Sequence, residues 1–176
     1  INTILISSAL YLFFITLRDF FNKSYKNFAQ NTAHFGFSLL ILSILFNNLF
    51  SSEIITNLKV GETYNNSKTK IVFESINQKK EKNYKSIIAN FNITNSQGIN
   101  NNLSPELRIY NQPNITTSEA DIKTTLMKDK FIVINLVQNQ DYFNVRYQVK
   151  PFMLWIWLSV IMISLGGLVS FLQKRI

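Results

Sequence analysis

Three long apolar runs alternate with polar segments along the chain. Residues 1–17 carry no charge, and no charged residue lies between Lys26 and Glu53. A third uncharged run follows Lys150. About 20 helical residues cross the hydrocarbon core of a bilayer, and 17 residues make a helix of about 25 Å. The pattern predicts transmembrane helices over 1–17, 31–52 and 151–172, with a polar loop over 18–30 and a short tail over 173–176.

The region over 53–149 has a different pattern, in which apolar and mostly polar residues alternate. This period of two is typical of half-buried strands. Turn-forming residues separate the alternating stretches, and long amphipathic crossover helices are missing, which argues against a parallel α/β fold. The sequence predicts an all-β soluble domain, an antiparallel sandwich or barrel of six or seven short strands. The stretches are Ile71/Phe73, Ile87/Ala89/Phe91/Ile93, Ile132/Ile134/Leu136 and Phe143/Val145/Tyr147/Val149, and the turns are Val60-Gly61, Asn65-Asn66-Ser67, Ser96-Gln97-Gly98 and Gln138 to Asp141.

One local helix is predicted in this domain, near Thr117 to Met127. The residues Thr116-Thr117-Ser118-Glu119 have the spacing of a capping box. Glu119 and Asp121 are an alternative acid/base pair, but side chains two residues apart diverge on a helix. The geometry therefore favours the cap.

The distribution of charge indicates an orientation. Arg18, Lys23 and Lys26 precede the second apolar run, and two basic residues lie in 173–176. By the positive-inside rule both basic groups share one side of the membrane, and 53–149 lies on the other. The net charge is +8, but the basic residues are scattered, which argues against a nucleic-acid surface.

The composition indicates a source compartment. Asn, Ile, Lys and Phe are abundant, whereas the chain has 5 Gly and 3 Pro. This bias towards residues with A+T-rich codons fits an organellar genome. On that interpretation the protein lies in the mitochondrial inner membrane, with the basic segments in the matrix and the β-domain in the intermembrane space.

The candidate chemistry of the chain is limited. There is no cysteine, hence no thiolate site, and a single histidine, so this chain alone cannot build a multi-histidine metal centre. His34 follows Ala33 and precedes Gly36 near the basic end of the second run. A neutral imidazole there is a possible haem iron ligand, and small neighbours let a macrocycle or another helix come close. The alternative is an interfacial histidine with its polar edge in the headgroups.

The segment Val145 to Phe171 joins the two parts of the chain. Pro151 suits a first helical turn, and Trp155 and Trp157 favour a membrane interface. Gly166-Gly167 predicts close packing against another helix.

Several collinear motifs between residues 33 and 172 resemble the carboxy-terminal part of CcmF, the membrane haem lyase subunit of the cytochrome c maturation pathway. They are Ala33-His34-Phe35-Gly36, Val60-Gly61-Glu62, Pro105 to Asn111, Thr117 to Ile122, Val145-Arg146-Tyr147, Lys150-Pro151-Phe152, Trp155-Ile156-Trp157 and Leu165 to Leu168.

The resemblance implies that His34 matches a transmembrane histidine that helps bind a b-type haem. It also implies transfer of haem, delivered by the chaperone CcmE, onto the two cysteines of a Cys-x-x-Cys-His motif in apocytochrome c. The tryptophan-rich segment of the family and its other histidines have no match here. We therefore expect a split mitochondrial form, a hetero-oligomer with N-terminal CcmF fragments and a CcmH-like subunit, in which another chain supplies the second axial ligand.

No residue of the chain is evident as a catalyst of thioether formation, so the chain is not expected to act as an enzyme alone. Two other functions remain open. One is a structural, CcmF-derived subunit of a respiratory assembly without lyase activity. The other is a simple membrane-tethered binding domain.

Overall fold

The computed structural model describes residues 2–21, 28–137 and 140–173, which form three helices and ten strands. The described residues form two compact units. The helical unit comprises those of 1–51, 125–129 and 150–176, and the β unit comprises those of 52–124 and 130–149.

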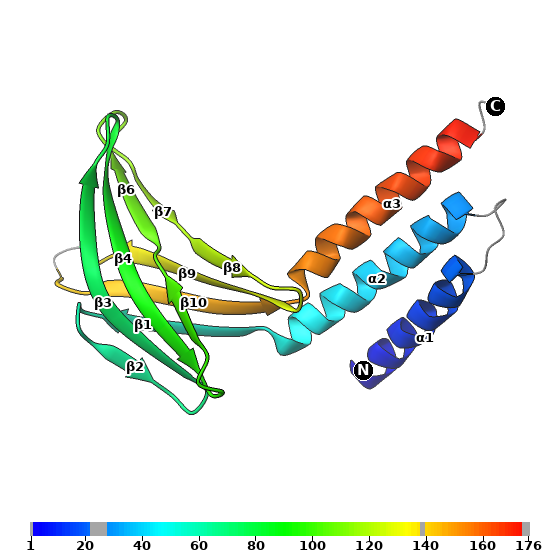
Figure 1. Ribbon diagram of the computed structural model, residues 1–176, viewed down its shortest axis with the longest axis horizontal. Coiled ribbons are helices and arrows are strands. Elements are labelled where there is room, and N and C mark those ends of the chain that lie inside the picture. Colours follow the sequence, from blue (N-terminus) through cyan, green and yellow to red (C-terminus); the bar gives the residue numbers. More distant parts are fainter. Residues whose placement is uncertain (1, 22–27, 138–139, 174–176) are drawn as a thin grey trace. The chain divides into compact units, whose positions relative to one another are not determined.

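The helical unit contains the three apolar helices expected from the sequence (Figure 1). They are α1 (Asn2–Phe21), α2 (Phe28–Phe50) and α3 (Met153–Gln173), and each is long and apolar enough to cross a membrane. Helices α1 and α2 extend from both sides into 18–30, the expected loop. Of the five basic residues used for orientation, only Arg18 lies among the described residues.

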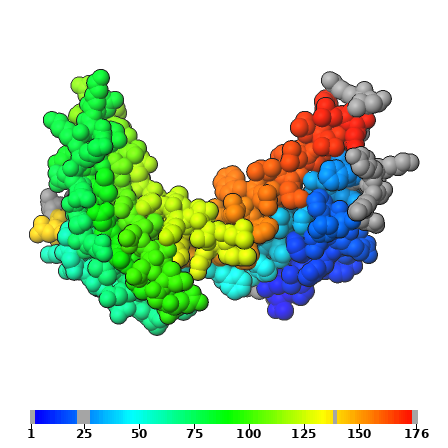
Figure 2. Space-filling view, in the orientation of Figure 1, coloured from blue at the N-terminus to red at the C-terminus, as the bar shows by residue number. Residues whose placement is uncertain are grey.

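Helix α2 lies between α1 and α3 (Figure 1, Figure 2). Glycines bring α2 and α3 together: a Cβ atom added to Gly36 would lie 3.0 Å from the Ser159 carbonyl oxygen. One added to Gly166 would lie 2.7 Å from the Ala29 carbonyl oxygen and 2.8 Å from the Ala33 nitrogen. The predicted close packing is present at Gly166, whereas Gly167 has nothing within 4 Å of an added Cβ.

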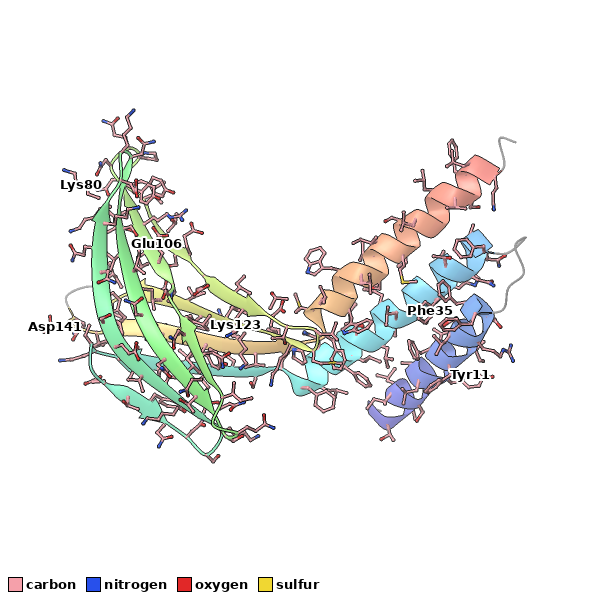
Figure 3. All side chains as sticks on the ribbon, viewed as in Figure 1. Tyr11, Phe35, Lys80, Glu106, Lys123 and Asp141 are labelled. Carbon is pink, nitrogen blue, oxygen red and sulfur yellow. The ribbon has the colours of Figure 1, made fainter. Side chains whose placement is uncertain are left out.

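Helices α1 and α2 are joined by rings and by two polar contacts. Phe35 on α2 stacks with Phe20 on α1 at a centroid distance of 5.0 Å, and it lies where α2 faces α1 (Figure 3). The buried hydroxyls of Thr16 and Ser38 are 2.5 Å apart. The Asn31 side-chain amide donates to the Asp19 carbonyl at 2.6 Å. In an apolar medium such paired hydroxyls and amides hold two helices together.

The start of α3 differs from the prediction. Pro151 is the last residue of β10 (Phe143–Pro151), and the helix begins two residues later, after Phe152 with φ of 60°. This left-handed residue turns the chain sharply from strand to helix, a change that Pro151, with its fixed φ, cannot make. The Pro151 carbonyl accepts a hydrogen bond from the Asn47 side chain at 2.5 Å.

The β unit is an antiparallel sandwich, one of the two predicted architectures, but it has ten strands where six or seven were expected. One sheet has the order β1-β10-β9-β8, and the other β2-β3-β4-β6-β7, with β5 paired to β4. The extra strands are short or polar, and alternation alone does not reveal them. The strands are β1 (Ser52–Leu58), β2 (Thr63–Asn65), β3 (Thr69–Lys80), β4 (Tyr84–Asn95), β5 (Asn100–Leu103), β6 (Glu106–Tyr110), β7 (Thr116–Glu119), β8 (Asp121–Thr124), β9 (Lys128–Leu136) and β10.

Most residues of the sandwich core are ones that alternate in the sequence, and Leu58, Leu103 and Leu107 join them from other strands. Phe73 and Phe91 stack with centroids 4.4 Å apart, and both are fully buried. Ile132 and Ile134 of β9 and Val145 of β10 are also fully buried. The predicted strands are therefore confirmed as β3, β4, β9 and β10.

The turns follow the predicted chemistry where they are described. Gly61 has φ of 88° and Gly98 has φ of 75°, values that favour glycine. The Asn66 side chain accepts hydrogen bonds from the backbone of Lys68 and Thr69. The predicted turn from Gln138 to Asp141 lies partly outside the described residues, which omit 138 and 139.

The predicted helix near Thr117 to Met127 is wrong. This segment forms β7, β8 and the following turn, and Leu107 to Ile109 of β6 pair with Ser118 to Thr116. The Thr117 hydroxyl approaches the Glu119 carboxylate at 3.4 Å and caps no helix. Threonine is β-branched and suits a strand, and pairing with β6 satisfies the backbone groups that a cap would satisfy.

Candidate functional site

His34 lies in the second turn of α2 and its side chain is exposed. It lines a groove between α2 and α1 together with Leu12, Thr16 and Phe37. The two α1 residues are one turn apart, so they present one face of α1 to the histidine. The sequence pattern indicates none of these three partners of His34. Both helices are apolar all round, and such a sequence does not say which face meets its neighbour.

The small residues beside His34 face α3. An added Cβ on Gly36 would touch Ser159, Met162 and Ile163, and Ala33 packs against Gly166. Of the two alternatives for these small residues, the structure shows close approach of a helix. The imidazole itself lies at the α1 side of α2, in the groove.

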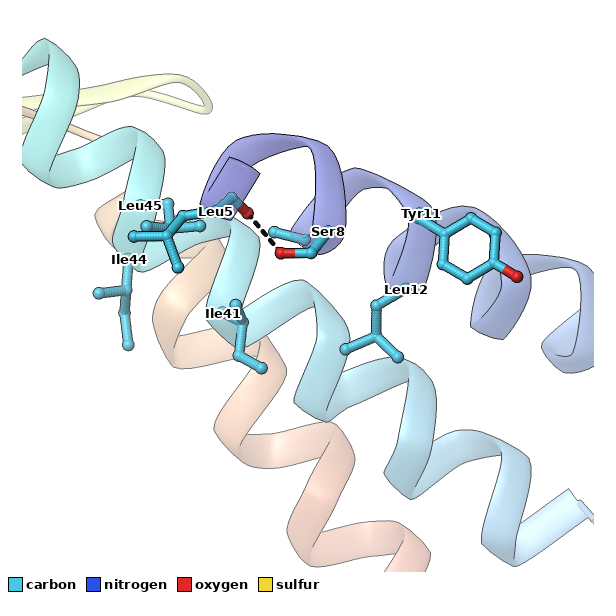
Figure 4. Close-up of a pocket in the computed structure, with 8 residues that line it drawn as sticks. Leu5, Ser8, Tyr11, Leu12, Ile41, Ile44 and Leu45 are labelled. Carbon is cyan, nitrogen blue, oxygen red and sulfur yellow. Dashed lines mark hydrogen bonds between the residues drawn. The ribbon is translucent and has the colours of Figure 1, made fainter. Parts of the chain in front are cut away.

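The groove beside His34 has a volume of about 280 Å³. A separate hollow lies along the same seam between α1 and α2, nearer the N-terminal end of α1 (Figure 4). It has a volume of about 510 Å³ and shares one lining residue, Leu12, with the groove beside His34. This size lies within the range of about 300–1,000 Å³ seen for ligand and cofactor sites. Its polar lining groups are the hydroxyls of Ser8 and Tyr11, and Ser8 donates to the Leu5 carbonyl at 3.0 Å. The remaining lining residues are Leu5, Ala9, Ile41, Ile44 and Leu45.

The donor set fits one axial position of a haem better than a metal ion held by protein ligands alone. No group of three His, Cys, Asp or Glu residues that could hold a metal occurs within 2–21, 28–137 and 140–173. A porphyrin brings its own ring nitrogens and needs one or two axial ligands from protein. In the described part of the chain His34 has no hydrogen-bond or ion-pair partner, so its imidazole is available for such a bond.

Glu119 and Asp121, the alternative acid/base pair of the sequence, each contact a different group of the sandwich. The Glu119 carboxylate lies 3.7 Å from the Arg108 guanidinium. The Arg108 guanidinium also donates a hydrogen bond to the Glu106 carboxylate at 3.0 Å. This bond lowers the pKa of the Glu106 carboxyl. Asp121 accepts a hydrogen bond from the Ser104 backbone at 2.6 Å. These contacts tie strands of the sandwich together and leave His34 as the candidate ligand.

The fold and the groove define a class: a membrane protein in which three apolar helices accompany an antiparallel β-sandwich, with a histidine on the middle helix. The family model described as "CcmF C-terminal beta-sandwich" matches residues 49–151. The chain belongs to this family.

Curated relatives agree with the assignment. The chain is 26% identical over 163 residues to the cytochrome c-type biogenesis protein CcmF of Haemophilus influenzae. The matched residues make up 93% of this chain and 25% of the relative. It is 26% identical to CcmF of Escherichia coli, over 81% of this chain and 22% of the relative. The chain thus spans about a quarter of the length of these relatives.

A solved structure shares the fold. The structure named cytochrome c heme lyase CcmF superposes with a TM-score of 0.66 at 15% identity, covering 91% of this chain and 28% of that one. The predicted resemblance to the C-terminal part of CcmF is therefore confirmed, and so is the predicted combination of helices and β-sandwich.

Proposed function

We propose that this chain is the C-terminal subunit of a CcmF-type cytochrome c haem lyase. In this proposal it helps to bind a b-type haem through His34 and to position haem and apocytochrome c for covalent attachment. In this proposal another chain supplies the second ligand of the haem iron, and His34 is the one histidine among these 176 residues. The observation that supports this most directly is the exposed imidazole at an apolar groove.

The surroundings of His34 suit one face of a haem. Leu12 and Phe37 offer apolar contacts for a macrocycle, and Thr16 is fixed by its contact with Ser38. When bound, the haem iron would supply redox and ligand-exchange chemistry, whereas the residues of this chain hold and orient the group. The face of α2 that contacts α3 fixes the rotation of α2, and therefore the direction of the His34 side chain.

The proposed partners are those of a CcmF-type assembly. The chain matches about a quarter of the length of its relatives, and in this proposal it forms a hetero-oligomer with N-terminal CcmF polypeptides. A haem chaperone of the CcmE type, a CcmH-like subunit and apocytochrome c complete the assembly. We further propose the mitochondrial inner membrane as its place, with the β-sandwich in the intermembrane space. The biased composition and the basic residues before α2 support this localisation.

The test is haem occupancy of the complex isolated from membranes with its partner chains. The reduced-minus-oxidised spectrum should show b-haem, and His34→Ala should abolish at least half of that signal and reduce attachment of haem to cytochrome c. Asn48→Ala is the matched control, because Asn48 is an exposed polar residue of the same helix. Full haem occupancy and full attachment in His34→Ala would overturn the proposal.

A structural subunit of a respiratory assembly without lyase activity is the second candidate. The distance from the relatives, at 22–27% identity, is compatible with a retained fold and a changed role. This candidate predicts that the isolated assembly contains respiratory subunits and that His34→Ala leaves cytochrome c attachment intact.

A further inference from the structure

The turn between β8 and β9 is a tightly closed loop with an apolar tip. The Thr125 N–H and hydroxyl both donate to the Lys128 carbonyl, at 3.0 and 2.6 Å. The Lys128 N–H donates back to the Thr125 hydroxyl at 3.2 Å. These bonds hold Leu126 and Met127 at the tip, where their side chains are 59% and 54% exposed. Two adjacent exposed apolar side chains at the tip of a hydrogen-bonded turn call for an explanation.

This turn is bound to the first turn of α3. The Phe152 N–H donates to the Met127 carbonyl at 2.9 Å, and the Trp155 indole N–H donates to the Leu126 carbonyl at 2.9 Å. Both tip carbonyls therefore accept hydrogen bonds from the start of α3, while both tip side chains are exposed. The turn belongs to the helical unit, although it connects two strands.

The residue types at the start of α3 are those that favour the boundary of a bilayer. The helix is an apolar span from Met153 onwards, and tryptophans concentrate where lipid headgroups meet acyl chains. Trp157, 63% exposed, follows Trp155 within the first turns. The hydrogen bonds from Phe152 and Trp155 place Leu126 and Met127 beside this first turn of α3.

Basic side chains beside the tip fit the same location. Lys128 follows Met127 directly, and Lys150 precedes the proline before α3; both are half-buried. Lysine stems lie along apolar surface while their ammonium groups reach headgroup phosphates. Apolar residues flanked by lysines are the pattern of a segment that lies in a membrane interface.

We infer that the β8–β9 turn is a membrane-interface anchor, in which Leu126 and Met127 insert among the lipid headgroups beside the N-terminal end of α3. The partner is a phospholipid surface, and the anchor does not depend on haem or on lyase activity. Trp155 acts as the positioning residue that holds the turn at this depth. The anchor would give the chain an attachment to the membrane besides its three helices.

The test uses the absence of cysteine from the chain. The full chain with Met127→Cys carries a fluorophore and is reconstituted into phosphatidylcholine vesicles that contain a lipid with a nitroxide in the headgroup region. Ile99→Cys, 53% exposed in a turn of the β unit, is the reference, and Leu165→Cys, 50% exposed within α3, is the reference for deep lipid. Leu126→Cys repeats the measurement should labelling at 127 disturb folding.

The expected result is quenching at 127 by headgroup nitroxide at least threefold stronger than at 99, with iodide in the water phase quenching 127 less than 99. Trp155→Phe keeps a ring but removes the indole N–H, and it should raise iodide quenching at 127. Equal quenching at 127 and 99 would overturn the inference. A probe at 127 shielded from both quenchers would also overturn it, since that result indicates contact with a second protein copy.

Discussion

The contact between α2 and α3 yields a matched pair of variants, Gly166→Ala and Gly167→Ala. A Cβ on Gly166 would lie 2.7 Å from the Ala29 carbonyl oxygen, whereas ordinary contact begins at 3.4 Å. The helices would therefore have to separate by about 0.7 Å at this point. The obstacle is backbone, which cannot rotate away as a flexible side chain does. Gly167 is its neighbour in the same helix, with open space at the corresponding position.

The magnitude follows from two effects. Overfilling a well-packed contact costs about 1–3 kcal/mol. Replacing glycine by alanine within a helix gains about 1 kcal/mol in water, and this gain applies equally to both variants. The free energy of unfolding of Gly166→Ala should therefore lie about 1–3 kcal/mol below that of Gly167→Ala. Gly167→Ala should equal or slightly exceed the wild-type chain.

The assay is equilibrium unfolding by sodium dodecyl sulfate in mixed micelles, followed by tryptophan fluorescence and by helical circular dichroism. Ala33 precedes His34, so separation of α2 from α3 should also lower haem occupancy of the complex in Gly166→Ala. Identical unfolding midpoints for the two variants would show that the close contact of α2 and α3 at Gly166 is absent from the protein.

Three further predictions concern the β-sandwich. Phe73→Ala should lower the free energy of unfolding by about 3–5 kcal/mol, measured by denaturant titration, because Phe73 is fully buried against Phe91; an effect below 1 kcal/mol would contradict this core. Burial raises the pKa of Tyr147 to about 12. The contribution of Tyr147 to the free energy of unfolding is therefore fully present below the unfolded pKa of about 10 and is lost as pH rises towards 12. Thermal melts in which Tyr147→Phe removes no part of this alkaline loss would refute the assignment. The hydrogen bond from Arg108 lowers the pKa of the Glu106 carboxyl. The contribution of Glu106 to the free energy of unfolding is therefore present above the unfolded pKa of about 4.3 and is lost as pH falls through the folded pKa. Arg108→Met should reduce this dependence of the unfolding free energy on acid pH.

The sequence predicted the elements whose pattern reports their surroundings. Phe73, Phe91 and Val145 alternate with mostly polar neighbours because one face of each strand is buried, and that alternation is readable without a structure. The prediction of a helix failed at Thr117 to Met127, where a local capping signal competed with pairing to β6. The sequence does not show that β6 and β7 lie side by side. The local spacing of the capping box was therefore the only signal that the sequence offered for this segment.

The candidate site was predictable in part. His34 was identifiable as the only histidine, but its groove was not, because the apolar residues of a span carry no mark of the face they present. The same limit applies to Gly166-Gly167, where the sequence indicates a helix contact and only the structure shows that Gly166 makes it. Leu12 and Thr16 join the site from a separate helix.

The most direct test of the proposed haem site is chemical rescue of His34→Gly in the complex isolated with its partner chains. Removing the imidazole should convert the b-haem spectrum from low-spin to high-spin, or remove the haem, because one of two axial ligands is lost. Imidazole added to the solution should restore the low-spin spectrum in His34→Gly and have no effect on Asn48→Gly. An unchanged low-spin spectrum in His34→Gly without imidazole would contradict axial ligation by His34.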